Sequence, residues 1–110
     1  MPHADDDHQD DLRLLEACRR GDQAALGHLL MRHQARMFGL CYRILRNRET
    51  AAESCQDAMV KLIQGLDGYD GRAKFTTWMT RIVINVCLSR LRSEKIRRAG
   101  SLDVEFGARG

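Results

Sequence analysis

The sequence predicts an all-α protein, a compact bundle of about four helices in one domain. The chain has 110 residues, of which 44% are hydrophobic and 30% are charged, and it contains a single proline. This length suits one modest hydrophobic core, and this balance is typical of folded rather than disordered chains. Apolar residues recur at intervals of three or four, which favours helices over strands.

The predicted elements follow one another with short connections. Residues 1–10 are expected to form an acidic flexible tail, and residues 11–98 the helical domain. A short helix begins near Leu12 and ends near Gly21. A second is capped by Asp22 and ends at about Arg46. Its predicted core positions are Leu26, Leu29, Leu30, Met37, Cys41, Ile44 and Leu45.

The stretch "TAAE", residues 50–53, is typical of a capping box, so a third helix is expected from there to about Gln64. The residues expected to face the core are Ala52, Cys55, Met59, Leu62 and Ile63. The opposite face displays Glu53, Gln56, Asp57 and Lys61.

Residues 65–74, "GLDGYDGRAK", contain three glycines and two aspartates and predict a loop. A last helix is expected from Thr77 to Arg92 or beyond, with Thr76 or Thr77 as its cap and Phe75 as a hydrophobic staple. Residues 99–110 lack helical periodicity and are expected to be a linker or a disordered end.

Several classes of function are not expected. The four cysteines (Cys18, Cys41, Cys55 and Cys87) form no CxxC pair and no export signal opens the chain, so they indicate reduced core thiols of a cytoplasmic protein. No metal site or cofactor is predicted, and the longest uncharged apolar run is too short to span a membrane. No nucleophile–base pair or phosphate-binding glycine motif indicates an enzyme.

Charge is segregated along the chain. The net charge is only +3, but residues 1–11 contain five aspartates and no Lys or Arg. Residues 72–98 contain eight Lys or Arg against the single acid Glu94. A solvated helix face usually mixes both signs at i,i+4 spacing, and here the partner acids are missing. The segregation therefore predicts a polyanionic partner for the C-terminal part.

The last helix carries a narrow polar stripe between broad apolar arcs. The stripe is Arg81, Asn85, Ser89 and Arg92, and the apolar residues are Trp78, Met79, Ile82, Val83, Val86, Cys87 and Leu91. Arginine suits phosphate, whereas Asn85 and Ser89 suit hydrogen bonds to a base edge or backbone. An alternative is that Asn85 only satisfies a buried carbonyl.

Three of the six aromatic residues, Tyr69, Phe75 and Trp78, lie within ten positions of one another beside this basic run. Aromatic faces next to cations are what a single strand of nucleic acid requires, because exposed bases stack and phosphates need neutralising. A glycine-rich loop can close around an extruded base. The alternative is that Phe75 and Trp78 simply fill the core.

Four stretches in this order resemble region 2, the promoter-melting domain, of bacterial sigma factors of the extracytoplasmic-function (ECF) group. They are "GDQAALGHLL", "LCYRILRNRETAAESCQDAMVKLIQ", "LDGYDGRAKFTTWMTRIVINVCLSRLR" and "KIRR", and they lie within residues 11–98. The most specific part is ExxQD followed by a Gly-Asp loop and FxTWxxRIxxN.

The resemblance implies two surfaces. Glu53, Gln56 and Asp57 would bind the coiled coil of the largest subunit of core RNA polymerase, and inhibitory anti-sigma proteins bind the same domain. The loop and last helix would bind the single-stranded non-template strand of the −10 promoter element. Tyr69 would line a pocket for a flipped base, with Ile82 beneath it and Asn85 facing the base. The full expected DNA-binding set is Tyr69, Lys74, Phe75, Thr77, Trp78, Arg81, Ile82, Asn85, Ser89, Arg92, Lys95 and Arg97.

The chain departs from the family pattern at Met59 and at Met79-Thr80, where many relatives have an aromatic residue and Leu-Tyr. Nothing in it corresponds to the family's second helical domain, which reads the −35 element. We therefore expect either a fragment cut in the linker after Arg98, which we favour, or a partner that supplies the missing contacts. Two other hypotheses stay open: a helix-turn-helix protein that binds duplex DNA, and a helical adaptor that binds only proteins.

Overall fold

The computed structural model describes the backbone of residues 4–107 and the side chains of residues 7–100. Within that range the protein contains helices and no strand, so the predicted all-α fold is confirmed. The elements are α1 (Ala4–Arg19), α2 (Gln23–Leu45), α3 (Arg48–Gly65), the short 3₁₀ turn η1 (Leu66–Gly68) and α4 (Phe75–Gly107).

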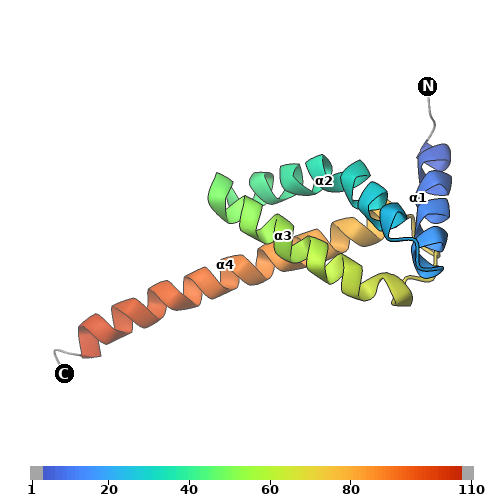
Figure 1. Cartoon of the computed structure of the whole chain (residues 1–110). Coiled ribbons are helices and arrows are strands. Elements are labelled where there is room, and N and C mark those ends of the chain that lie inside the picture. The colour runs from blue at the N-terminus through green and yellow to red at the C-terminus, as the bar shows by residue number, and fades with distance from the viewer. Residues whose placement is uncertain (1–3, 108–110) are drawn as a thin grey trace.

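The helices α2 and α3 run antiparallel, and α4 packs along both of them (Figure 1). The helix α1 stands at one end of the bundle, where it contacts α2 and the beginning of α4. Past the ends of α2 and α3, α4 continues as a single projecting helix (Figure 1). Its 33 residues correspond to roughly 50 Å at 1.5 Å per residue, which accounts for most of the 61 Å long dimension.

The core lies where α2, α3 and α4 meet. On α2 the buried residues recur at every fourth position, which places them on one stripe. The largest enclosed side chains elsewhere include Leu15 from α1, Leu62 from α3 and Phe75, Met79 and Val83 from α4. Among the described residues, no helix combines the length and apolar character that crossing a membrane requires.

The ends of α2 are as predicted, but the beginning of α3 is not. The Asp22 side chain accepts from the Ala25 N–H at 3.2 Å. The capping box at residues 50–53 is wrong: α3 begins at Arg48, and the Asn47 side chain accepts from the Thr50 N–H at 2.9 Å. Asparagine is a better N-cap than threonine, which favours the cap at Asn47 over one at Thr50.

The predicted inner face of α3 is only partly correct. Cys55 and Leu62 are buried, but Ala52 and Ile63 are exposed. The positions that contact the core are Ala51, Ser54, Cys55, Ala58 and Leu62. Small side chains on this face allow α3 to approach its neighbours closely, and the larger Val60 and Ile63 remain at the surface.

The acidic segment is helical from residue 4 onward, which corrects the flexible tail expected for residues 1–10. Residues 1–3 lie outside the described range. Partners far along the chain hold this part of α1. Asp7 pairs with Arg32 at 3.8 Å, and Asp11 is fully buried against α2. Burial and ion pairing with α2 thus stabilise a helix in a segment whose acidic composition is typical of a flexible tail.

The helix α4 is longer than predicted at both ends. It begins at Phe75, and the Lys74 carbonyl accepts the first-turn N–H groups of Thr77 and Trp78. Phe75 is therefore a core residue of the helix, not a staple preceding it. The helix continues to Gly107, so the linker expected at residues 99–110 is helical as far as it is described. No proline interrupts this stretch.

Candidate nucleic-acid interface

The polar stripe predicted on the last helix lies at the surface. Arg81, Asn85, Ser89 and Arg92 are all exposed on α4, as is Thr77 one turn earlier. The Arg92 guanidinium donates to the Ser89 hydroxyl at 3.4 Å. Because the Asn85 side chain is exposed, the alternative in which it satisfies a buried carbonyl is not what the structure shows.

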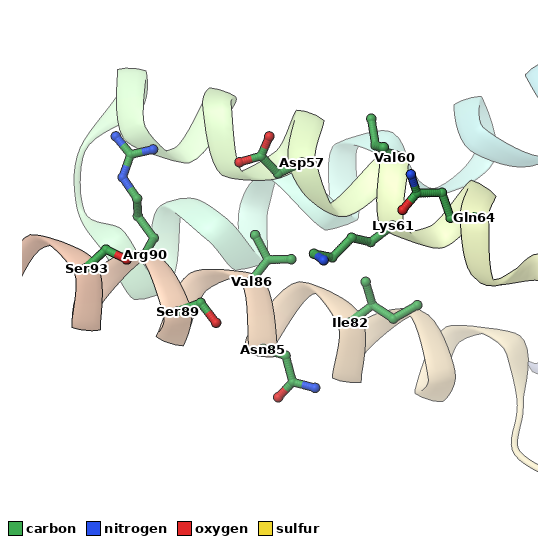
Figure 2. A pocket seen from close by; sticks show the side chains of 10 residues that line it. All are labelled: Asp57, Val60, Lys61, Gln64, Ile82, Asn85, Val86, Ser89, Arg90 and Ser93. Carbon is green, nitrogen blue, oxygen red and sulfur yellow. The ribbon is translucent and has the colours of Figure 1, made fainter.

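A groove of about 690 Å³ separates α3 from α4 beside this stripe (Figure 2). Val86 and Ile82 give it an apolar floor, and polar side chains from both helices form its rim. In Figure 2 the Lys61 side chain extends from α3 toward α4, while Asn85 projects from the side of α4 that faces away from α3. Asn85 therefore borders the groove and does not point into it.

A second, smaller hollow of about 340 Å³ lies over the loop that follows η1. Its wall is formed by Gly68, Tyr69, Asp70, Arg72, Ala73, Trp78 and Arg81. Arg81 belongs both to this hollow and to the polar stripe, so the two features are continuous along the surface. Two aromatic rings and two guanidinium groups around one depression match the chemistry that an unpaired base requires.

Tyr69 lines this hollow, but its side chain is buried beneath the surface and only 4% exposed. Its hydroxyl donates to the Ala73 carbonyl, and its ring lies 4.9 Å from the Trp78 ring. Burial raises the pKa of the Tyr69 phenol above its usual value, and the negative charges of Asp11 and Asp70 add to the shift. The direct contact with a base expected of Tyr69 stays a prediction.

The structure separates the roles of Phe75 and Trp78, which the sequence left open. Phe75 is 1% exposed, with ring centroids of His33 at 5.4 Å and Tyr69 at 5.7 Å. Its ring is therefore not available to stack on a base. Trp78 is half-buried and partly available. It packs over Gly65, where an added Cβ would lie 3.2 Å from the indole.

The basic residues are spread along this same face and along the projecting end of α4. Lys74, Lys95 and Arg97 are exposed, and Ile82 is half-buried at the groove. Lys61 was not predicted to belong to the site. Its only signal was a place on the polar face of the third helix, and the crossing of α3 and α4 makes it part of the groove.

The three acidic and amide residues predicted to bind polymerase are all exposed on α3, but they have different surroundings. Glu53 accepts from the Arg90 guanidinium of α4 at 2.8 Å. Asp57 borders the groove between α3 and α4. Gln56 borders a cleft between α2 and α3 that is lined largely by apolar side chains such as Met31, Phe38 and Met59.

The cysteines are free thiols, as predicted. Cys41, Cys55 and Cys87 are buried, and Cys18 is partly buried. A hydrogen bond with Cys55, together with burial, raises the pKa of the Cys41 thiol. Within the described part of the chain, no cluster of three or more His, Cys, Asp or Glu side chains is arranged to hold a metal ion.

Residues 29–97, which include the hollow, the groove and the stripe, match the Sigma-70 region 2 family. The chain belongs to this family. The resemblance seen in the sequence is thereby confirmed, and the stretch that matches the family runs from the second turn of α2 into the projecting part of α4.

The curated relatives of this region 2 domain are sigma factors. It is 31% identical over 81 residues to "ECF RNA polymerase sigma factor SigW" of Bacillus subtilis, and this alignment covers 74% of this chain and 43% of that protein. It is 34% identical to SigM of Mycobacterium tuberculosis (84% and 47% covered) and 32% identical to the ECF sigma-E factor of Escherichia coli (84% and 47%). The chain thus spans a little less than half the length of these relatives.

A solved structure has the same fold. It is an NMR structure of an engineered region 2 of sigmaE in complex with GTAAAA, with a TM-score of 0.73 and 31% sequence identity. The superposition covers 79% of this chain and 90% of the other. Both sequence and fold therefore relate this domain to one whose structure includes a short oligonucleotide.

Proposed function

We propose that this chain is the promoter-melting part of an ECF-type sigma factor, which binds core RNA polymerase and captures an unpaired base of the non-template strand at the −10 element. The observation that carries the proposal is the continuity of the exposed α4 stripe with the aromatic hollow through Arg81. The oligonucleotide-bound structure of a related region 2 supports it.

On the DNA side, each group of residues has a distinct part. Arg81, Arg92, Lys95 and Arg97 neutralise phosphates, with Lys61 added from α3. Such contacts position a strand but carry no sequence information. Asn85 and Ser89 offer donors and acceptors to base edges. The half-buried Trp78 ring gives an apolar surface on which a base can stack.

Strand separation in this proposal is driven by binding, with no change of covalent bonds and no cofactor. Extruding a base costs a few kcal/mol, and stacking on an aromatic ring returns roughly 1–3 kcal/mol. The net gain per base is small. The domain alone therefore binds single strands weakly, and it acts when polymerase holds it on the promoter in the cytoplasm.

On the protein side, Glu53, Gln56 and Asp57 on α3 contact the coiled coil of the largest polymerase subunit. The apolar cleft beside Gln56 and the exposed Met31, Val60 and Ile63 give the same helices surface for a second protein partner. An anti-sigma factor that competes with polymerase would fit this surface.

The proposal is tested by measuring whether the domain prefers single-stranded or duplex DNA. The domain is titrated with a fluorescent single-stranded GTAAAA oligonucleotide and with the matching duplex, at several salt concentrations. We expect the domain to prefer the single strand. The logarithm of its affinity should fall against the logarithm of salt concentration with a slope of about −3, for about four neutralised phosphates. Preference for the duplex would favour a helix-turn-helix regulator, and no binding to either at low salt would favour a protein-binding adaptor.

A further inference from the structure

The loop that forms the hollow is held from outside by α1, a helix to which the proposed function gives no part. The Arg19 guanidinium donates to the Leu66 carbonyl at 2.7 Å and also to the Tyr69 carbonyl. One nitrogen, Nη2, makes both contacts, with residues 47 and 50 positions further along the chain. Arg19 thus fixes the beginning of the loop, where η1 ends and residue 69 turns away.

The end of the loop is held by a second side chain of α1. The Nδ1 atom of the His8 ring accepts from the Phe75 N–H at 3.3 Å. Phe75 is the first residue of α4, and its N–H is one of those that a helix cannot satisfy internally. His8 therefore caps α4 from another helix, 67 positions earlier in the chain.

Between these two contacts α1 is locked against α2. Asp11 is 0% exposed, and its Oδ1 accepts from the His33 ring at 2.8 Å and from the Arg32 guanidinium at 3.0 Å. The His33 ring packs in turn against Phe75. Through this one carboxylate oxygen, Asp11 connects α1 to two neighbouring side chains of α2, and through His33 to the first residue of α4.

We propose that Arg19 and His8 are positioning residues, which hold the loop of residues 69–74 in its DNA-ready form before DNA arrives. The inference rests on the proposed function of the hollow as the site for an unpaired base. A loop that must be ordered during binding reduces affinity, whereas a loop already ordered does not pay that entropy. Neither residue needs to touch DNA for this effect.

The first experiment compares Arg19→Ala with Arg20→Ala in the full chain. Arg20 is the matched control, because it is exposed and forms an ion pair with Glu16 of its own helix at 3.3 Å. Backbone hydrogen exchange is followed at residues 69–73, and binding is measured with the single-stranded GTAAAA oligonucleotide. We expect Arg19→Ala to exchange faster in the loop and to bind about tenfold more weakly. Arg20→Ala should match the wild type in both measurements.

The second experiment addresses the other end of the loop. His8→Ala should speed exchange of the Phe75 amide and weaken oligonucleotide binding, and His8→Asn should restore part of both because its side chain can accept the same hydrogen bond. His28→Ala, a change at an exposed histidine, is the control. Thermal unfolding of each variant establishes that the folded fraction at the assay temperature is the same.

The outcomes separate this inference from the proposed function. If the wild type binds the oligonucleotide and Arg19→Ala and His8→Ala bind it equally well, the inference is overturned and the function stands. If the wild type does not bind the oligonucleotide, the proposed function fails. Unchanged hydrogen exchange in the variants would then also show that Arg19 and His8 do not hold the loop. If Arg19→Ala does not fold, the pair His8→Ala and His8→Asn decides.

Discussion

Arg90 of α4 donates to Glu53 of α3 at 2.8 Å across the two helices, and its Nε donates to Glu94 at 3.1 Å. Glu53 belongs to the surface proposed for polymerase, and Arg90 lines the groove beside the surface proposed for DNA. The ion pair therefore joins the surface proposed for polymerase to the groove beside the surface proposed for DNA.

The strength of this link can be measured by a double-mutant cycle. Glu53 is 60% exposed and Arg90 27%, and pairs of this kind contribute at most about 1 kcal/mol because water screens them. We expect Glu53→Ala and Arg90→Ala each to lower the free energy of unfolding by less than about 1 kcal/mol, and the double variant to lower it by less than the sum. Urea unfolding measures all four proteins, and strictly additive losses would contradict the link.

Tyr69→Phe should change how stability depends on pH. At neutral pH it should cost about 1 kcal/mol, because the hydrogen bond to the Ala73 carbonyl is lost. Burial raises the pKa of Tyr69 in the folded protein. The phenol therefore stays protonated at pH values at which the unfolded chain already releases that proton. Stability of the wild type should therefore fall as pH rises past about 10.

The variant lacks this ionisation, so its unfolding free energy should fall less over the same alkaline range. Tyr42→Phe, at a side chain 44% exposed, is the control. Identical alkaline losses in the wild type and in Tyr69→Phe would show that the phenol of Tyr69 is not held in its neutral form by the fold.

The orientation of α3 is tested by two neighbouring alanines. Ala51 is 0% exposed, whereas Ala52 is at the surface. Ala51→Leu should overpack the core and lower the free energy of unfolding by about 1–3 kcal/mol. Ala52→Leu should change it by less than about 0.5 kcal/mol. Denaturant unfolding measures both losses. A larger loss for Ala52→Leu than for Ala51→Leu would favour the orientation expected from sequence.

The beginning of α3 is tested by its cap. Asn47→Ala removes the acceptor for the Thr50 N–H and should cost about 1 kcal/mol. Thr50→Ala should cost clearly less, because Thr50 lies inside the helix and its backbone makes the contact. A larger loss for Thr50→Ala in thermal unfolding would favour the capping box first expected at residues 50–53.

Sequence periodicity predicted the helices better than it predicted their faces. The strong spacing of Leu29, Met37 and Cys41 identified the buried stripe of α2, and Asp22 identified its beginning. On α3 both faces carry small or moderately apolar residues, so periodicity alone cannot choose between Ala51 and Ala52. The choice depends on how closely the neighbouring helices approach.

Long-range contacts explain what the sequence could not show about the site. Asp11, His8 and Arg19 have their partners 21 to 67 positions away, so the acidic segment resembled a tail. Lys61 enters the groove only because α3 and α4 cross beside it. The stripe of Arg81, Asn85 and Arg92 was predictable, because it depends only on the period of one helix.

The central claim is that this stripe meets an unpaired strand, with a different part for each residue. The most direct measurement compares Asn85→Ala and Arg92→Ala for binding to single-stranded GTAAAA oligonucleotides in which one base is changed at a time. We predict that Asn85→Ala reduces discrimination at one position, and that Arg92→Ala weakens all sequences alike and makes the salt slope smaller by about 1. Equal weakening of every sequence by both variants would contradict the account.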